Sequence, residues 1–247
     1  VSKWQAEMRR FDEDFRPLTS ENLRYCINET NLDGVWPAQY ARSIVHLELL
    51  RNQNYILGTD TPRFKPGLLT LNPPPQFSLV IFDEAHHLRN MDTNSYEVAR
   101  FLCDVSEAVV LLSATPVHLG SENLYVLLQL LRPDLLPDFV VFQQMMEPNP
   151  HLIRAMSHIR TRLPRENWQV DTLSAIDEAL NTDWGEKVLQ YDQRVSSWKA
   201  RLSEQSDLND EERVRFLRDL EDVHTLAHLM NRTRRRDIGQ FTIREPH

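Results

Sequence analysis

The chain has 247 residues and a formal net charge of −8, with 41% hydrophobic and 26% charged residues. This length allows one large domain or two small ones, and the apolar share is sufficient for a packed core. Two cysteines exclude a disulfide framework and indicate a reducing compartment, and no apolar run approaches the roughly 18 residues of a membrane span. We therefore expect a cytoplasmic protein that has no contact with a membrane.

The first third of the chain shows patterns of unequal clarity. Apolar residues, Trp4 among them, recur at helical spacing, which predicts an amphipathic helix over residues 1–15. Residues 16–42 are polar and mixed and permit no assignment. Residues 43–51 predict a short strand that passes into a helix, and the residues 58–76, rich in proline, glycine and threonine, predict a long loop.

The middle of the chain alternates strand and helix patterns. Strands are expected at residues 78–83 and 107–116, and helices at residues 94–105 and 121–131. Both strands are apolar runs, as expected for strands that are covered on both faces. Asn94 and Ser121 are the expected caps of the two helices. This alternation predicts a parallel sheet in an α/β layer fold.

The pattern changes again after about residue 138. Residues 140–230 contain one glycine, and their only strand-like stretch is "FVVF". Charged, amphipathic segments at 172–204 and 210–230 predict a helical hairpin that stands off the α/β core, with Asp210 at the start of its second helix. The charge of these segments is typical of a solvated face.

Carboxylate and hydroxyl side chains follow the two predicted strands. Asp83 and Glu84 end the first strand, and Ser113, Ala114 and Thr115 end the second. Functional sites in open parallel sheets lie beyond the carboxyl ends of the strands, so we expect these residues to be neighbours. Mg²⁺ prefers hard oxygen ligands and keeps several waters, which Asp83 and substrate phosphates would satisfy. Glu84 is then placed to orient or deprotonate a water that attacks a terminal phosphate.

The residues at these strand ends resemble a known family. "DEAHHLRN" and "LLSATP" resemble the Walker B (DEAH-box) and third motifs of superfamily 2 helicases. Their flanks, "FSLVIFDEAHHLRN" and "LLSATPVHLGSENLYVLLQLLRPDLL", resemble the Swi/Snf-type branch. "VSKWQAEMRRFDEDF" resembles the stretch after motif Ia of that branch, and "MNRTRRRDIGQFTIREP" the arginine-rich segment that closes its first RecA-like lobe. Within this branch, the chain resembles bacterial members linked to RNA-polymerase recycling or to the DISARM antiphage system.

The resemblance implies an α/β fold, an incomplete RecA-like (P-loop NTPase type) parallel sheet with an α-helical insertion. Residues 1–139 would be the later part of the first lobe, residues 140–230 a helical protrusion, and residues 231–247 the closing arginine-rich segment. The chain has no GxxxxGK[ST] run to cradle phosphates, and no second lobe. It also lacks a starting Met. We therefore expect the chain to be part of a longer protein and to be inactive alone.

The resemblance also implies roles for three residues of the DEAH box. Asp83 would hold Mg²⁺ through water, Glu84 would be the catalytic carboxylate, and His86 would link the nucleotide site to the third motif. His87 lies outside the four-residue box and is given no role.

In the third motif, Ser113, Ala114 and Thr115 would couple the state of the nucleotide to the grip on nucleic acid. Four arginines near the C-terminal end would either contact phosphates or the other lobe, or pair with acidic neighbours: Arg232, Arg234, Arg235 and Arg236.

The expected activity is that of an ATP- and Mg²⁺-dependent motor that translocates on double-stranded DNA. Its expected partners are the second RecA-like lobe and RNA polymerase or phage-defence proteins. Two alternatives stay open: an unwinding DEAH-box helicase or restriction-type translocase, and a non-catalytic nucleic-acid-binding or scaffold module. A general phosphohydrolase is disfavoured because the sequence has no other cluster of metal ligands.

Overall fold

The chain divides into two compact units, Val1–Pro137 and a second that begins at Asp138. The computed structural model describes residues 1–59, 65–113, 120–160, 167–204, 207–227 and 229–230. Within these residues, no helix is long and apolar enough to cross a membrane.

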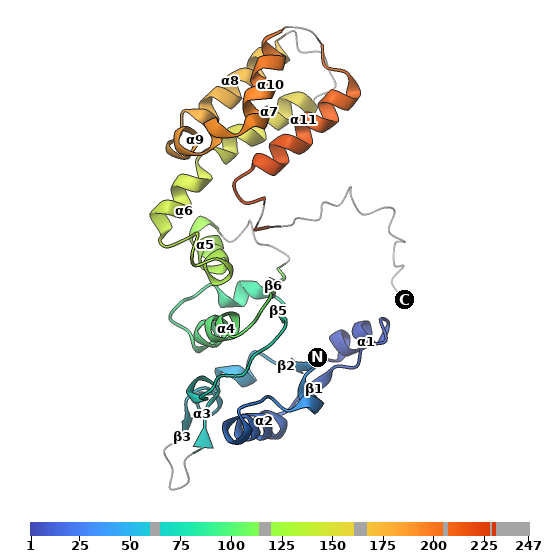
Figure 1. Ribbon diagram of the computed structural model, residues 1–247, viewed down its shortest axis with the longest axis vertical. Coiled ribbons are helices and arrows are strands. Elements are labelled where there is room, and N and C mark those ends of the chain that lie inside the picture. The colour runs from blue at the N-terminus through green and yellow to red at the C-terminus, as the bar shows by residue number, and fades with distance from the viewer. Residues whose placement is uncertain (60–64, 114–119, 161–166, 205–206, 228, 231–247) are drawn as a thin grey trace, which may run out of the picture. The chain divides into compact units, whose positions relative to one another are not determined.

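The first unit mixes helices with short strands (Figure 1). Its α-helices are α1 (Ser2–Arg9), α2 (Ser20–Asp33), α3 (Gln53–Ile56), α4 (Asn94–Asp104) and α5 (Gly120–Leu131). Its 3₁₀ helices are η1 (Ala38–Tyr40), η2 (Leu49–Arg51), η3 (Leu68–Thr70) and η4 (Ala85–Leu88). Its strands are β1 (Arg16–Leu18), β2 (Ser43–Val45), β3 (Gly58–Thr59), β4 (Lys65–Pro66), β5 (Val80–Phe82) and β6 (Val109–Leu111).

These strands pair two by two. β1 is parallel to β2, β3 is antiparallel to β4, and β5 is parallel to β6 with Ile81 opposite Val110. The predicted mixed α/β class with parallel pairing is therefore confirmed for the described residues.

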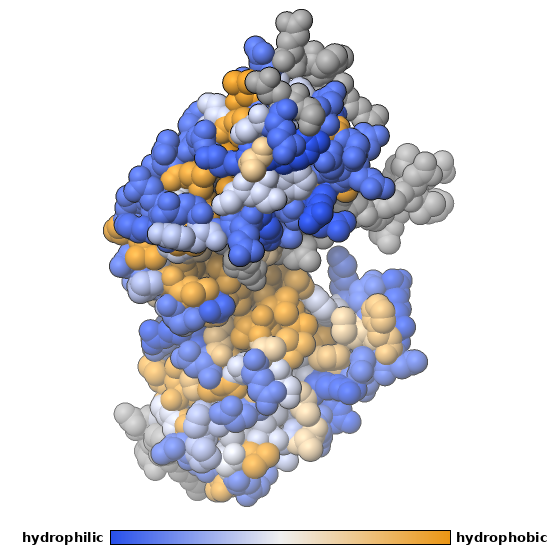
Figure 2. Space-filling model, turned by 45° about the horizontal axis from the view of Figure 1, so that its top comes forward, coloured by the Kyte–Doolittle hydropathy of each residue, from blue (hydrophilic) through white to orange (hydrophobic). Residues whose placement is uncertain are grey.

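The β5–β6 pair has one covered face. Phe82 and Leu111 point to the side where residues of η4, α4 and α5 form an apolar cluster. On the opposite side, four apolar residues are exposed in the described structure: Leu79, Ile81, Val110 and Leu112. Figure 2 shows apolar side chains gathered on the visible surface of the molecule. The expectation that both faces are covered is thus wrong for the described residues.

The N-terminal region is more ordered than its sequence pattern indicates. The predicted helix over residues 1–15 ends at Arg9, and Asp12 follows with φ 58°, which breaks helical geometry. Residues 16–42, which permitted no assignment, contain β1 and α2. The side chain of Thr19 caps α2 by accepting a hydrogen bond from the Asn22 N–H, and Gly34 ends it with φ 72°.

Neither predicted cap in the middle of the chain is the N-cap of its helix. Thr93, not Asn94, caps α4, and its hydroxyl accepts from the Tyr96 N–H at 3.3 Å. Helix α5 begins at Gly120, so Ser121 lies inside it.

The second unit is helical in its described part (Figure 1). Its α-helices are α6 (Phe139–Met146), α7 (Asn149–Arg160), α8 (Trp168–Leu180), α9 (Asp183–Lys187), α10 (Gln193–Ser203) and α11 (Asp210–Val223), with a 3₁₀ helix η6 (Leu189–Tyr191). The strand-like "FVVF" lies in α6, where Asp138 caps the helix by accepting from the Val141 N–H. Helix α11 begins at Asp210 as predicted.

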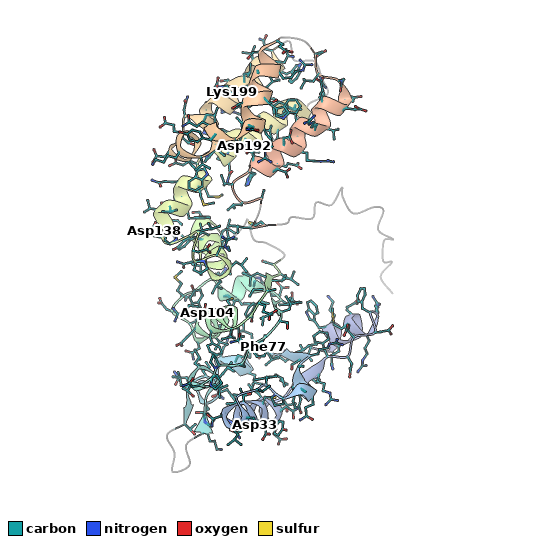
Figure 3. All side chains as sticks on the ribbon, viewed as in Figure 1. Asp33, Phe77, Asp104, Asp138, Asp192 and Lys199 are labelled. Atoms are coloured by element: carbon teal, nitrogen blue, oxygen red, sulfur yellow. The ribbon has the colours of Figure 1, made fainter. Side chains whose placement is uncertain are left out.

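An apolar core joins α7, α8, α10 and α11. Phe216 is fully buried and stacks on Trp198 at 4.3 Å between ring centroids, and the indole of Trp198 donates to Asp219 at 2.7 Å. Asp192 caps α10, and Lys199 of α10 pairs with Asp177 of α8 at 2.6 Å. Both Asp192 and Lys199 are labelled in Figure 3.

Candidate functional site

The ends of β5 and β6 are joined by backbone hydrogen bonds. The Leu112 N–H donates to the Phe82 carbonyl at 2.8 Å, and the Ala85 N–H donates to the Leu112 carbonyl at 2.8 Å. The loop that carries Asp83 and Glu84 is therefore fixed to the residue just before Ser113. Figure 1 shows the two strands side by side. The structure brings the acidic loop and the start of the "SAT" sequence together, while Ala114 and Thr115 lie outside the described residues.

Glu84 connects β5 to η4 in a conformation that is unusual for a residue with a side chain. Its φ of 50° and ψ of 46° lie in the left-handed region, which L-residues other than glycine seldom occupy. Such a conformation costs of order 1–3 kcal/mol and persists where the surrounding structure imposes it. The bond from the Ala85 N–H to Leu112 is one such constraint, and it leaves the Glu84 side chain about half exposed.

The carboxylate of Asp83 accepts a hydrogen bond at each oxygen. Its Oδ1 accepts from the Glu84 N–H at 2.9 Å, and its Oδ2 accepts from the indole Nε1–H of Trp4 at 2.7 Å. Each carboxylate oxygen has two acceptor sites, so both keep one for a further donor or a metal-bound water. The side chain is also exposed. These features are compatible with water-mediated Mg²⁺ binding.

Asp83 and Glu84 are not part of a larger cluster of metal ligands. In the described part of the chain, no group of three or more His, Cys, Asp or Glu residues could hold an ion. A metal at this site would therefore depend on water and substrate oxygens for most of its ligands, as Mg²⁺ sites usually do.

His86 turns back toward Glu84. Its Nδ1 lies 3.2 Å from Glu84 Oε2, but the geometry makes no hydrogen bond, and this nitrogen is buried without a hydrogen-bond partner in the described structure. The His86 ring lies 4.2 Å from that of His87. The three predicted residues of the DEAH box are thus close together, with Asp83 and Glu84 exposed to solvent and His86 partly covered.

An open hollow of about 440 Å³ lies beside this loop. It is lined by His87 and by Arg51 and the start of α4, where Arg51 donates to the Ser95 hydroxyl at 2.8 Å. A larger hollow, of about 690 Å³, belongs to the helical unit and is lined by α10 residues such as Lys199. It contains none of the predicted site residues.

The four predicted arginines near the C-terminal end lie outside the described residues: Arg232, Arg234, Arg235 and Arg236.

The sequence pattern predicts Trp4 only as part of an apolar helical stripe. Its contact with Asp83 spans 79 positions, and no local pattern in the sequence could have indicated it.

The sequence matches a family model. Residues 70–173 match the SNF2-related domain, a range that includes both strand ends of the candidate site.

Curated relatives extend the similarity to nearly the whole chain. The RNA polymerase-associated protein RapA of Vibrio parahaemolyticus is 28% identical over 99% of this chain and 23% of its own length. That of Haemophilus influenzae is 28% identical over 99% of this chain and 24% of its own. That of Photobacterium profundum is 30% identical over 57% of this chain and 13% of its own. The chain spans about a quarter of the length of the first two. These similarities confirm the resemblance of the chain to Swi/Snf-type proteins of superfamily 2.

Proposed function

We propose that this chain supplies the hydrolytic carboxylates of a Swi/Snf-type ATPase that moves along double-stranded DNA, within an incomplete RecA-like lobe. The observation that carries the proposal is the joined ends of β5 and β6. They place Asp83, Glu84 and His86 in one loop that is bonded to the residue before Ser113. The similarity to the SNF2-related domain supports the same assignment.

In the proposed mechanism, Glu84 is the catalytic carboxylate. Its exposed side chain can accept a proton from, or orient, the water that attacks the terminal phosphate of ATP. His86 lies next to Glu84 and would link the nucleotide site to the third motif. Asp83 would hold Mg²⁺ through water, and the ion, when bound, would neutralise charge on the phosphates. Ser113, at the adjoining strand end, would transmit the state of the nucleotide together with Ala114 and Thr115.

We further propose that residues outside this chain complete the ATP site. The sequence contains no GxxxxGK[ST] run, so it has no backbone cradle of that type for the phosphates. The chain alone is therefore expected to hydrolyse no ATP. The parent protein would have a second RecA-like lobe, and ATP binding and hydrolysis would close and open the two lobes.

The DNA grip of such a motor is mainly to phosphates. It is therefore independent of sequence and weakened by salt. Arg232, Arg234, Arg235 and Arg236 are proposed as contacts to phosphates or to the other lobe. The helical residues 140–230 are proposed as a protrusion from the lobe. The name of the curated relatives makes RNA polymerase the partner to test, and phage-defence proteins are the alternative.

ATP hydrolysis by the parent protein tests this proposal. Wild type and Glu84→Gln are compared with double-stranded DNA, single-stranded DNA, RNA or no nucleic acid. We expect duplex DNA to stimulate turnover, and Glu84→Gln to reduce it at least about 100-fold, since positioned proton transfer contributes about 10² to 10⁴. Glu107→Gln is the matched control, because this exposed glutamate lies before β6, at the opposite end of the same strand pair.

The other outcomes favour specific alternatives. Stimulation by single strands or RNA, together with strand displacement, would favour an unwinding helicase. Absence of turnover under every condition, with nucleic-acid binding retained, would favour a non-catalytic binding or scaffold module. An equal loss in Glu84→Gln and Glu107→Gln would contradict the role of Glu84.

A further inference from the structure

One side chain of helix α1 is hydrogen-bonded to the candidate site. None of the residues of α1 is fully buried, so side-chain packing by itself holds the helix only weakly. The indole of Trp4 is partly buried and donates to Asp83 at 2.7 Å. This distance is at the short end of the range for an N–H donor and a carboxylate. The bond joins the N-terminal helix to the end of β5, 79 positions away.

This contact determines how Asp83 is oriented. The Glu84 N–H fixes Oδ1, and the Trp4 indole fixes Oδ2, so the carboxylate cannot rotate without breaking a hydrogen bond. The indole N–H is a donor only, so the bond requires an accepting oxygen at Asp83. Its ring is rigid and holds the donor in one direction.

We propose that Trp4 is a positioning residue for Asp83, and that it orients this carboxylate toward the Mg²⁺-bound water of the ATP site. The inference rests on the proposed function. Outer partners that orient a ligand typically change metal affinity by 10- to 100-fold. The contact lies at the surface, so we expect an effect at the lower end of that range.

The test is Mg²⁺-dependent binding of a fluorescent, non-hydrolysable ATP analogue to the parent protein. Trp4→Phe keeps the aromatic ring and removes the donor. We expect it to raise the Mg²⁺ concentration for half-maximal binding roughly tenfold. Binding in EDTA should not change. Trp36→Phe is the matched control, because its indole donates to the Tyr40 carbonyl in the same unit and should leave the Mg²⁺ dependence unchanged.

A second comparison tests whether Trp4 acts through Asp83. In an Asp83→Asn background, Trp4→Phe should cause no further loss of Mg²⁺-dependent binding. The hydrogen bond itself is checked by the ¹⁵N–¹H signals of the indoles in the 247-residue chain, where Asp83→Ala should shift the Trp4 signal and leave that of Trp36 in place.

The outcomes separate this inference from the proposed function. If Trp4→Phe behaves like Trp36→Phe, or weakens binding equally with Mg²⁺ and in EDTA, Trp4 only anchors α1 and the inference is wrong. If the wild-type parent shows no Mg²⁺-dependent binding of the nucleotide, the proposed function is overturned and the inference with it.

Discussion

The left-handed backbone of Glu84 and its role as the proposed catalytic residue are related. The conformation turns the chain sharply between β5 and η4, at the residue that carries the proposed catalytic carboxylate. A residue with a Cβ at this position destabilises the fold slightly, and glycine would relieve the strain. The presence of a glutamate at a position that favours glycine is consistent with selection for its side chain.

The two cysteines are expected to be poor nucleophiles. Cys26 is fully buried in α2, Cys103 is partly buried in α4, and burial raises the pKa of each thiol to about 11, from an ordinary 9.0. The folded chain should then hold roughly a hundredth of the usual thiolate near pH 8. We expect alkylation by iodoacetamide to be slowed about as much, and to reach the usual rate in urea.

The same raised pKa values have a consequence for stability. The folded state binds the thiol protons more tightly than the unfolded state, so this contribution to stability is fully present below pH 9.0 and is lost as the pH rises toward about 11.

The control for the alkylation experiment is Asn28→Cys, which supplies an exposed thiol in α2 that should react fast in the folded chain. Rapid labelling of Cys26 under native conditions at pH 8 would contradict the burial.

Residues of the candidate site differ in how far the sequence could predict them. Asp83, Glu84 and Ser113 follow apolar runs, and the rule that parallel strand ends meet at one edge was sufficient to place them together. The Trp4 contact depends on how the chain turns at Asp12, between α1 and β1, which no local pattern specifies.

Among the secondary-structure elements, the apolar runs identified β5, β6, α4 and α5 correctly, because these have strong periodicity or composition. The apolar runs could not show that β5 and β6 have only one covered face among the described residues. A strand covered on one face and a strand covered on both faces can have the same apolar sequence. "FVVF" has high strand propensity, but the Asp138 cap and packing in the helical unit make it a helix.

Helix α9 packs closely against the end of α8, and Gly185 makes this possible. A Cβ at Gly185 would lie 2.1 Å from the Ala179 carbonyl oxygen and 2.7 Å from Leu180 backbone atoms. The backbone at Ala179 and Leu180 would have to move to make room for the added Cβ. We therefore expect Gly185→Ala to lower the free energy of unfolding by about 1–3 kcal/mol, although alanine has a higher helix propensity than glycine. Urea unfolding followed by circular dichroism measures this.

Glu186→Ala is the control for that substitution. The residue is adjacent in α9 and exposed, so its replacement should change the free energy of unfolding by no more than about 0.5 kcal/mol. A Gly185→Ala chain as stable as wild type would show that α9 is not held against α8 as described.

At the scale of the whole molecule, the two units have separate apolar cores. The helical unit buries a cluster that includes Phe216, Trp198 and Leu220, while the first unit buries others that include Leu23 and Ile27. No buried residue is shared between these clusters. A core substitution in one unit should therefore act on that unit first.

Phe216→Ala tests this division. Phe216 is fully buried and stacked on Trp198, so its truncation should lower the free energy of unfolding of the helical unit by about 3–5 kcal/mol. Hydrogen exchange followed by mass spectrometry should then show faster exchange in α7, α8, α10 and α11, with unchanged exchange in α2 and α4. Val214→Ala, an exposed substitution in the same helix, should change neither. Equal acceleration in α2 would mean that the units unfold as one cooperative body, and that the helical segment stabilises the unit that carries Asp83 and Glu84.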